Sequence, residues 1–319
     1  MEFLEVLSSV AVILDESIKL LPKNGKLVAL ITTFSLLLLS ASFLIFSFSS
    51  KFLLDDMLAK QSSFTTSSSS NPADYTTILS SIMEDFRLVV VVNVSYVLST
   101  FIIKLFPETA IVILSAMSYT GKTLSFKELL LKVIRSWIRP FVTGFFTTLF
   151  AVGYFFFATA VASPMLVFSG TFFRPIAILI GGIAYVFSLY LSVVWVMALV
   201  ISVIEENCYG IKALGKAEAL VKGKKLDGFI INIGFNLISL ILFQGFRSII
   251  GEKWMGTHMT VFWLLLVNWS CLQMIFLLVT YTVLYFHCKK HHGEEVELLQ
   301  GSFSYSKLST ASPFNNAVP

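Results

Sequence analysis

Long apolar runs separated by short polar segments dominate the chain. A helix needs about 20 apolar residues to cross a bilayer. Six ranges meet or approach this length: 27–50, 88–118, 141–162, 176–204, 229–246 and 261–287. The pattern predicts an all-α integral membrane bundle of about six transmembrane helices over 27–287, with amphipathic cytosolic helices beside it.

The composition supports this class. The 319 residues are 56% hydrophobic and 13% charged, whereas soluble domains are about 45–50% apolar and about 25% charged. Glu2 and Glu5 precede the first apolar run, where a secretory signal peptide would begin with basic residues. We therefore expect the N-terminus to be retained.

Basic residues are unevenly distributed. Most of them lie in the segments 19–26, 122–139, 212–225 and 289–307. Two predicted spans separate each of these segments from the next, so all four lie on the same side of the membrane. Because Lys and Arg favour the cytoplasmic side, we predict that both termini are cytosolic, with 288–319 as a flexible cytosolic tail. The span lengths suit the endoplasmic reticulum or the plasma membrane.

The stretch SYTGKTLSF, residues 118–126, looks like the end of a nucleotide-binding loop. A P-loop requires a second glycine five residues before Gly121, but Ala116 stands there. We expect neither a nucleotide nor a nucleic acid as a partner. Instead, Ser125 and Glu128 form a capping box, which marks the start of a helix.

The helix predicted after this box is basic and amphipathic. Its apolar stripe is Phe126, Leu129, Leu130, Val133, Ile134, Trp137 and Ile138. Such a helix lies at a membrane interface with its cations toward anionic headgroups, or it packs under the bundle with its basic face in water. The candidates for headgroup or partner contact, here and in the later basic segment, are Lys122, Lys127, Lys132, Arg135, Arg139, Lys222, Lys224 and Lys225.

The segment 1–26 is predicted to form a cytosolic amphipathic N-terminal helix. Its apolar stripe is Phe3, Leu7, Val10, Leu14, Ile18 and Leu21. Pro22 and Gly25 then interrupt the helix before the first span.

Ionisable residues within the predicted spans are candidates for function, because burying a charge in lipid is costly. The intramembrane polar candidates are Lys104, Glu108 and Arg174. The alternative is that Pro107 places Lys104 at the membrane edge, where its ammonium reaches water. The segment 107–118 is then either a continuation of the second span, kinked or interfacial, or a re-entrant segment.

An internal repeat is suggested when Tyr119 is aligned with Tyr209, since the lysines, leucines and glutamates that follow coincide. Internal symmetry is common among transporters, so this favours a transporter or channel as an alternative function. Gly181 and Gly182 are predicted to allow close packing of helices.

No catalytic or metal-binding pattern is recognisable. Cys208, Cys271 and Cys288 are too scattered for a disulfide framework or a zinc site. Cys288, His291 and His292 have side chains that bind metals, but we expect a flexible patch without fixed geometry. Cys288 is either palmitoylated or a free or buried thiol. We expect no cofactor and no enzymatic activity.

Three segments resemble a plant-specific family of uncharacterised polytopic membrane proteins with about six spans. They are VILDESIKLLPKNGKL, ETAIVILSAMSYTGKTLSFKELLLKVIRSWIRPFVTGF and YGIKALGKAEALVKGK. The resemblance covers roughly residues 1–290, and Asp15 stands where the family usually has Arg. It implies a membrane topology and a plant source, and it assigns no catalytic residue.

These observations favour a non-enzymatic protein that organises membranes or binds partners through its basic cytosolic helices. A transporter or channel for a small solute is the main alternative, and a lipid-modifying enzyme is a weaker one.

Overall fold

The computed structural model describes residues 2–66, 72–122, 124–167 and 173–293, and these form helices without any strand. The elements are α1 (Glu2–Leu20), the 3-10 helix η1 (Leu21–Asn24), α2 (Gly25–Thr66), α3 (Pro72–Tyr119), α4 (Phe126–Ser136), α5 (Ile138–Val167), α6 (Phe173–Ile204), α7 (Ile211–Val221) and α8 (Lys225–His291). The all-α prediction is confirmed for this part of the chain.

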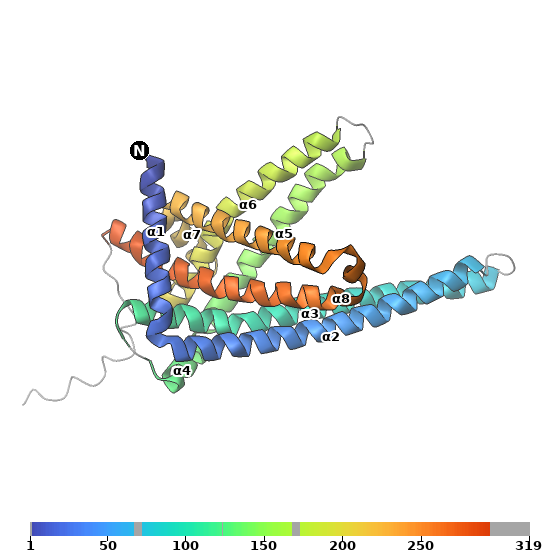
Figure 1. Ribbon diagram of the computed structural model, residues 1–319, viewed down its shortest axis with the longest axis horizontal. Helices are drawn as coiled ribbons and strands as arrows, with labels where there is room; N and C mark the ends of the chain where they lie inside the picture. Colours follow the sequence, from blue (N-terminus) through green and yellow to red (C-terminus); the bar gives the residue numbers. More distant parts are fainter. Residues whose placement is uncertain (1, 67–71, 123, 168–172, 294–319) are drawn as a thin grey trace, which may run out of the picture.

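Three helical hairpins make up most of the molecule (Figure 1). The first is the α2–α3 pair and the second is the α5–α6 pair. The third is α8 itself, which folds back so that its two arms lie side by side. The hydroxyl of Tyr281 on the second arm donates a hydrogen bond to the side-chain oxygen of Asn232 on the first, at 2.9 Å.

Within the described ranges, six helical segments are long and apolar enough to cross a membrane. They are Leu4–Lys60, Met83–Tyr119, Ile138–Pro164, Pro175–Ile204, Lys225–Ser248 and Met259–His291. Each of the six ranges expected from the sequence lies inside one of these segments. The lengths and compositions indicate a membrane-embedded protein.

The segment 107–118 continues the second apolar helix. α3 runs through Pro107 to Tyr119 without interruption, and all the residues from 109 to 118 are buried. A helix that is apolar around its whole circumference is stable only when surrounded by other elements. The re-entrant alternative is therefore wrong.

The tightest packing gathers at one end of the molecule, which we call the base. It consists of residues 109–118 of α3, 197–204 of α6 and 278–289 of α8, covered by α1, α4 and α7. Large side chains such as Tyr281, Tyr285 and Met197 are fully enclosed there. The base joins the three hairpins at the end of the molecule that α1 crosses (Figure 1).

α1 crosses the base at a steep angle to α2, α3 and α8 (Figure 1). Its buried side chains are Val10, Ile13, Ser17 and Leu20. Of the expected stripe, Leu7 and Ile18 are exposed instead, so the predicted stripe is offset from the buried face. The buried face also includes the polar residue Ser17, whose hydroxyl donates to the carbonyl oxygen of Ile13 at 2.6 Å. A search for apolar positions alone therefore does not identify this face.

Away from the base the α5–α6 hairpin diverges from the others (Figure 1). No residue from 149 to 164 is buried. Gly181 and Gly182 are exposed, with no side chain or neighbouring helix within 4 Å of where a Cβ would stand. The prediction that these glycines allow close packing is therefore wrong within this chain.

α8 also extends further than expected. It continues through His291, so residues 288–291 are helical and the boundary of the flexible tail at 288 is wrong. The positions from 294 onward, including Glu294 and Glu295, lie outside the described residues.

Candidate functional site

Gly121 and Lys122 of the G-K-T stretch lie at the end of α3, and Ser125 precedes α4; Thr123 lies outside the described residues. Gly121 has a positive φ of 73°, a conformation that glycine adopts at the C-termini of helices at little cost. The Lys122 N–H donates to the carbonyl oxygen of Met117 at 3.0 Å, which closes α3. The Ser125 N–H then donates to the Glu128 carboxylate at 3.0 Å, and the predicted capping box opens α4. Nothing in this geometry forms a phosphate cradle.

α4 has three distinct faces. The inner face, Leu129, Val133 and Ser136, is buried against the bundle. One flank exposes the apolar side chains of Phe126, Leu131 and Ile134, with the exposed Lys127 one turn before Leu131. Trp137 and Ile138, directly after the helix, are exposed as well. The other flank carries Glu128, Lys132 and Arg135. The predicted apolar stripe is therefore divided between the bundle and an exposed flank.

The basic residues on α4 and directly beside it have no ion-pair partner among the described residues. They are Lys127, Lys132 and Arg135 on the helix, with Lys122 before it and Arg139 after it. Partial burial, followed by the nearby charge of Lys122, lowers the pKa of Lys132. A negative ligand beside Lys132 and Lys122 would relieve their mutual repulsion.

α7 has a different environment, although it also follows a long helix and precedes another. Its inner residues Ala213, Ala217, Leu220 and Val221 are buried. Its exposed residues are two charged ones and three small or apolar ones: Lys212, Glu218, Ile211, Gly215 and Ala219. The order α3–α4–α5 is repeated as α6–α7–α8. With Tyr119 on Tyr209, however, α4 corresponds to residues 216–226 while α7 spans Ile211–Val221, so the proposed register of the repeat is wrong.

The three basic candidates after α7 differ from one another. Lys222 is exposed. The ammonium of Lys224 lies 3.1 Å from the buried Asp227 carboxylate and donates to the Ser9 hydroxyl at 3.1 Å. Lys225 lies over the ring of Tyr190, 5.5 Å from its centre. Only Lys222 therefore resembles the unpartnered cations of α4.

Polar contacts fix α1 and α7 to the base. Glu205 at the end of α6 accepts a hydrogen bond from the Tyr285 hydroxyl at 2.9 Å and pairs with Lys216 of α7 at 2.8 Å. Glu16 of α1 contacts the His287 ring at 2.8 Å. The base therefore holds the elements around α4 in place through these contacts.

The intramembrane candidates do not form one group. Lys104 and Glu108 line a cleft of about 260 Å³ among α3, α5, α6 and α8. α3 extends 15 residues beyond Lys104, or about 22 Å at 1.5 Å per residue, so Lys104 does not lie at the end of its helix; its position relative to the membrane edge stays a prediction. Arg174 belongs to the first turn of α6, 21 residues before Trp195 of the cleft, and its side chain lies outside the described part.

Interhelical hydrogen bonds within the apolar helices were not foreseen from the sequence. The Asn232 side chain donates to the Ser192 hydroxyl at 2.7 Å and to the Leu189 carbonyl oxygen at 3.1 Å. The Gln273 amide donates to the Phe235 carbonyl oxygen at 2.9 Å. The available indication was the presence of amide side chains inside apolar runs, since such groups need partners at membrane depth.

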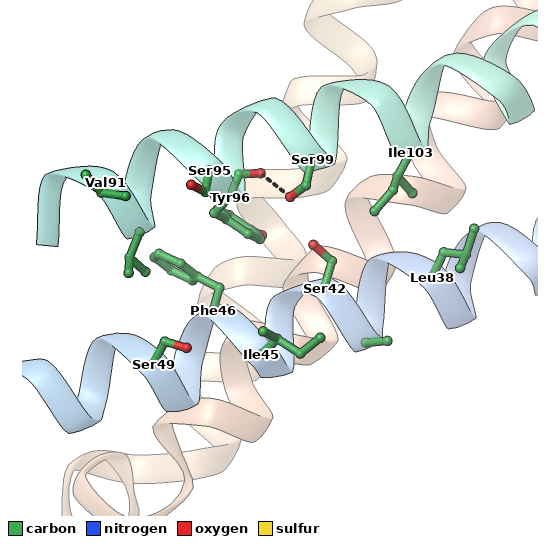
Figure 2. Close-up of a pocket in the computed structure, with 12 residues that line it drawn as sticks. Leu38, Ser42, Ile45, Phe46, Ser49, Val91, Ser95, Tyr96, Ser99 and Ile103 are labelled. Carbon is green, nitrogen blue, oxygen red and sulfur yellow. Dashed lines mark hydrogen bonds between the residues drawn. The ribbon is translucent and has the colours of Figure 1, made fainter. Parts of the chain in front are cut away.

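A groove lies between α2 and α3 (Figure 2). It has a volume of about 540 Å³ and is mostly apolar, with the stacked rings of Phe46 and Tyr96 4.2 Å apart at its centre. The hydroxyl of Ser99 donates to the Tyr96 carbonyl oxygen at 3.0 Å, and Ser42 faces it from α2 (Figure 2). No charged group lines this groove, so it offers shape but little chemistry.

The cysteines are poor candidates for reaction or lipidation. Cys271 and Cys288 are buried, and Cys208 is partly exposed. Burial, and secondarily the Glu205 charge, raises the pKa of the Cys208 thiol. Complete burial of Cys288 contradicts the palmitoylation alternative. No group of His, Cys, Asp or Glu in the described ranges is arranged to hold a metal ion.

Comparison with known proteins gives one informative result. Neither the curated proteins nor the solved structures yield a match. A family model described as a domain of unknown function, DUF8558, matches residues 1–302. Since the match extends over nearly the whole chain and includes the base and all three hairpins, the protein is a member of the DUF8558 family.

Proposed function

We propose that this protein is a non-enzymatic, six-span membrane protein that uses α4 to bind anionic lipid headgroups at the cytosolic interface. In this topology the base and both termini are cytosolic, which agrees with the concentration of basic residues near the base. The membrane is the endoplasmic reticulum or the plasma membrane. We also propose that the DUF8558 family is the plant family that the sequence resembles.

The observation that carries this proposal is the arrangement of the faces of α4. An apolar flank exposed beside a basic flank would be unfavourable in water, and Leu131 is 68% exposed. At a membrane interface the same arrangement is favourable, because the apolar flank enters the acyl region while the cations reach the headgroups. Burial contributes about 1.5–3 kcal/mol for each large apolar side chain, and each cation about 1 kcal/mol.

The position of α4 in the chain supports the same conclusion. It connects the apolar helices α3 and α5 at the base, so it lies at the depth where both leave the hydrocarbon. Its inner face holds it in place, so binding requires little ordering. Organisation of anionic lipids around the bundle, or recruitment of a partner to that lipid patch, would follow from such a site.

The test is the composition of lipids retained by the purified full-length protein. We expect protein extracted from mixed phosphatidylcholine and phosphatidylserine membranes to retain several-fold more phosphatidylserine than a variant carrying Lys127→Gln, Lys132→Gln and Arg135→Gln. The matched control removes three exposed cations at the opposite end, Lys51→Gln, Arg87→Gln and Arg247→Gln. Equal loss of phosphatidylserine in both variants would show that α4 has no special role.

A further inference from the structure

The cleft around Lys104 and Glu108 has features that lipid binding by α4 does not explain. It lies between α3 and the α5–α6 hairpin, with α8 closing the side. Leu278, the first residue of the α8 segment in the base, is one of its lining residues. Glu108 is 11 residues from the end of α3, or about 16 Å along the helix, which is half the thickness of a bilayer core of about 30 Å.

The two charges in this cleft are not neutralised by direct contact. Lys104 and Glu108 are one helical turn apart and share one face of α3, and each feels the other's charge. Within the part of the chain that the structure describes, however, neither side chain forms a hydrogen bond or an ion pair. Charged groups at this depth normally pair with each other, with water or with a ligand.

The rest of the cleft combines polar and apolar groups. Thr147 and Thr148 of α5 and Trp195 of α6 line it along with the two charges. The Thr147 hydroxyl already donates to the Gly144 carbonyl oxygen at 3.0 Å. Phe101 and Met274 are among the apolar residues of the wall. A mainly apolar cavity with a few convergent polar groups is the usual form of a small-molecule site.

The size of the cleft limits its occupant. Drug-sized ligands occupy sites of about 300–1,000 Å³, and this cleft has about 260 Å³. A sterol or a whole phospholipid does not fit inside. Several water molecules would fit, since each occupies about 30 Å³, but water would make no favourable contact with the apolar residues of the wall.

We propose that this cleft binds a small zwitterion with an apolar substituent, of the size and chemistry of a neutral α-amino acid. The ligand carboxylate accepts hydrogen bonds from the Lys104 ammonium, and the ligand ammonium donates to the Glu108 carboxylate. Both contacts are charge-assisted and therefore stronger than neutral hydrogen bonds. The substituent lies against Phe101 and Met274.

The order of charges on α3 selects against other ligands. A simple fatty acid would satisfy Lys104 but would place its carboxylate beside that of Glu108, and like charges at short range disfavour binding. A simple amine would have the reverse difficulty with Lys104. Only a ligand with both charges neutralises both side chains.

The experiment measures thermal unfolding of the full chain in nanodiscs of neutral lipid, with leucine as the probe. We expect leucine at about ten times its Kd to raise the unfolding midpoint by about 2–4 °C. N-acetyl-leucine, which lacks the cation, and leucine amide, which lacks the carboxylate, should produce no shift. Arg135→Gln on α4 is the control variant and should retain the response to leucine.

Three variants test the assignment of residues. Lys104→Met and Glu108→Gln should each abolish the shift caused by leucine. Ala151→Phe fills the cleft without altering a charge and should also abolish it, while direct binding of radiolabelled leucine confirms the loss independently of stability.

Several results would overturn the proposal. If neither leucine nor phenylalanine binds, the cleft contains only water. An equal shift with N-acetyl-leucine would show a simple anion site, and an unchanged response in Glu108→Gln and Ala151→Phe would place the ligand elsewhere.

Discussion

Replacement of Gly228 by alanine tests the close packing of α8 against α6. Gly228 lies in the first turn of α8, where that helix approaches α6. A Cβ at this position would stand 2.6 Å from the Cγ1 atom of Val193, which is closer than such atoms approach in folded proteins. Val193 is 1% exposed and is β-branched, so its side chain has little freedom to rotate away.

The expected cost follows from two opposing effects. Overpacking a core by one methyl group costs about 1–3 kcal/mol, whereas replacing glycine by alanine inside a helix gains about 0.5–1 kcal/mol. Gly234→Ala in the same helix isolates the first effect, because nothing lies within 4 Å of its Cβ position. Relative to that control, we expect Gly228→Ala to be less stable by about 1–3 kcal/mol.

The assay is the midpoint of thermal unfolding in detergent micelles for both variants. We expect the Gly228→Ala midpoint to be roughly 2–6 °C below that of Gly234→Ala. Adding Val193→Ala to Gly228→Ala should cost less than it does in the native chain, because it removes the clash, with a coupling of about 0.5–3 kcal/mol. Equal midpoints for the two glycine variants, or strictly additive effects, would refute the proposed contact.

Two further predictions concern the apolar helices and the thiols. Tyr281→Phe removes the hydroxyl that donates to the side-chain oxygen of Asn232 at 2.9 Å. We expect the free energy of unfolding to fall by about 0.5–1.5 kcal/mol, measured by the same thermal unfolding assay. An unchanged midpoint would mean that this hydrogen bond contributes nothing to stability. Alkylation of the folded protein, followed by mass spectrometry, should modify only Cys208 among the three cysteines. Because the pKa of Cys208 is raised, its rate at pH 8 should lag behind that of a free thiol and increase with pH, and modification of Cys288 without denaturant would contradict its burial.

Most of the fold was predictable from local patterns. Runs of apolar residues identify helices by length alone, and the capping box at Ser125 marks the start of α4 because its hydrogen bonds are local. The fate of α3 at Pro107 was not predictable, since packing around 109–118 determines whether a helix continues past a proline. Sequence periodicity could not identify the inner face of α1 either, because several apolar residues, including Leu7, Val12 and Ile18, are exposed.

The candidate sites were predictable in part. The cations of α4 were evident, but the division of its apolar stripe depends on contacts with helices distant in the sequence. Lys104 and Glu108 were recognisable as charges in an apolar run, whereas their cleft requires α5, α6 and α8. Lys224 and Asp227 are three residues apart, so their pairing is local. Their contacts with Ser9, more than 200 positions away, are not predicted by any local pattern.

The divergence of the α5–α6 hairpin has a mechanical consequence. This hairpin is fixed near the base, and its far half touches little else in the described part of the chain. In a bilayer that thins or comes under tension, we expect the far half of the hairpin to tilt, while its contacts near the base stay intact. Because residues of α5 and α6 line the Lys104–Glu108 cleft, we expect such a movement to change the width of the cleft.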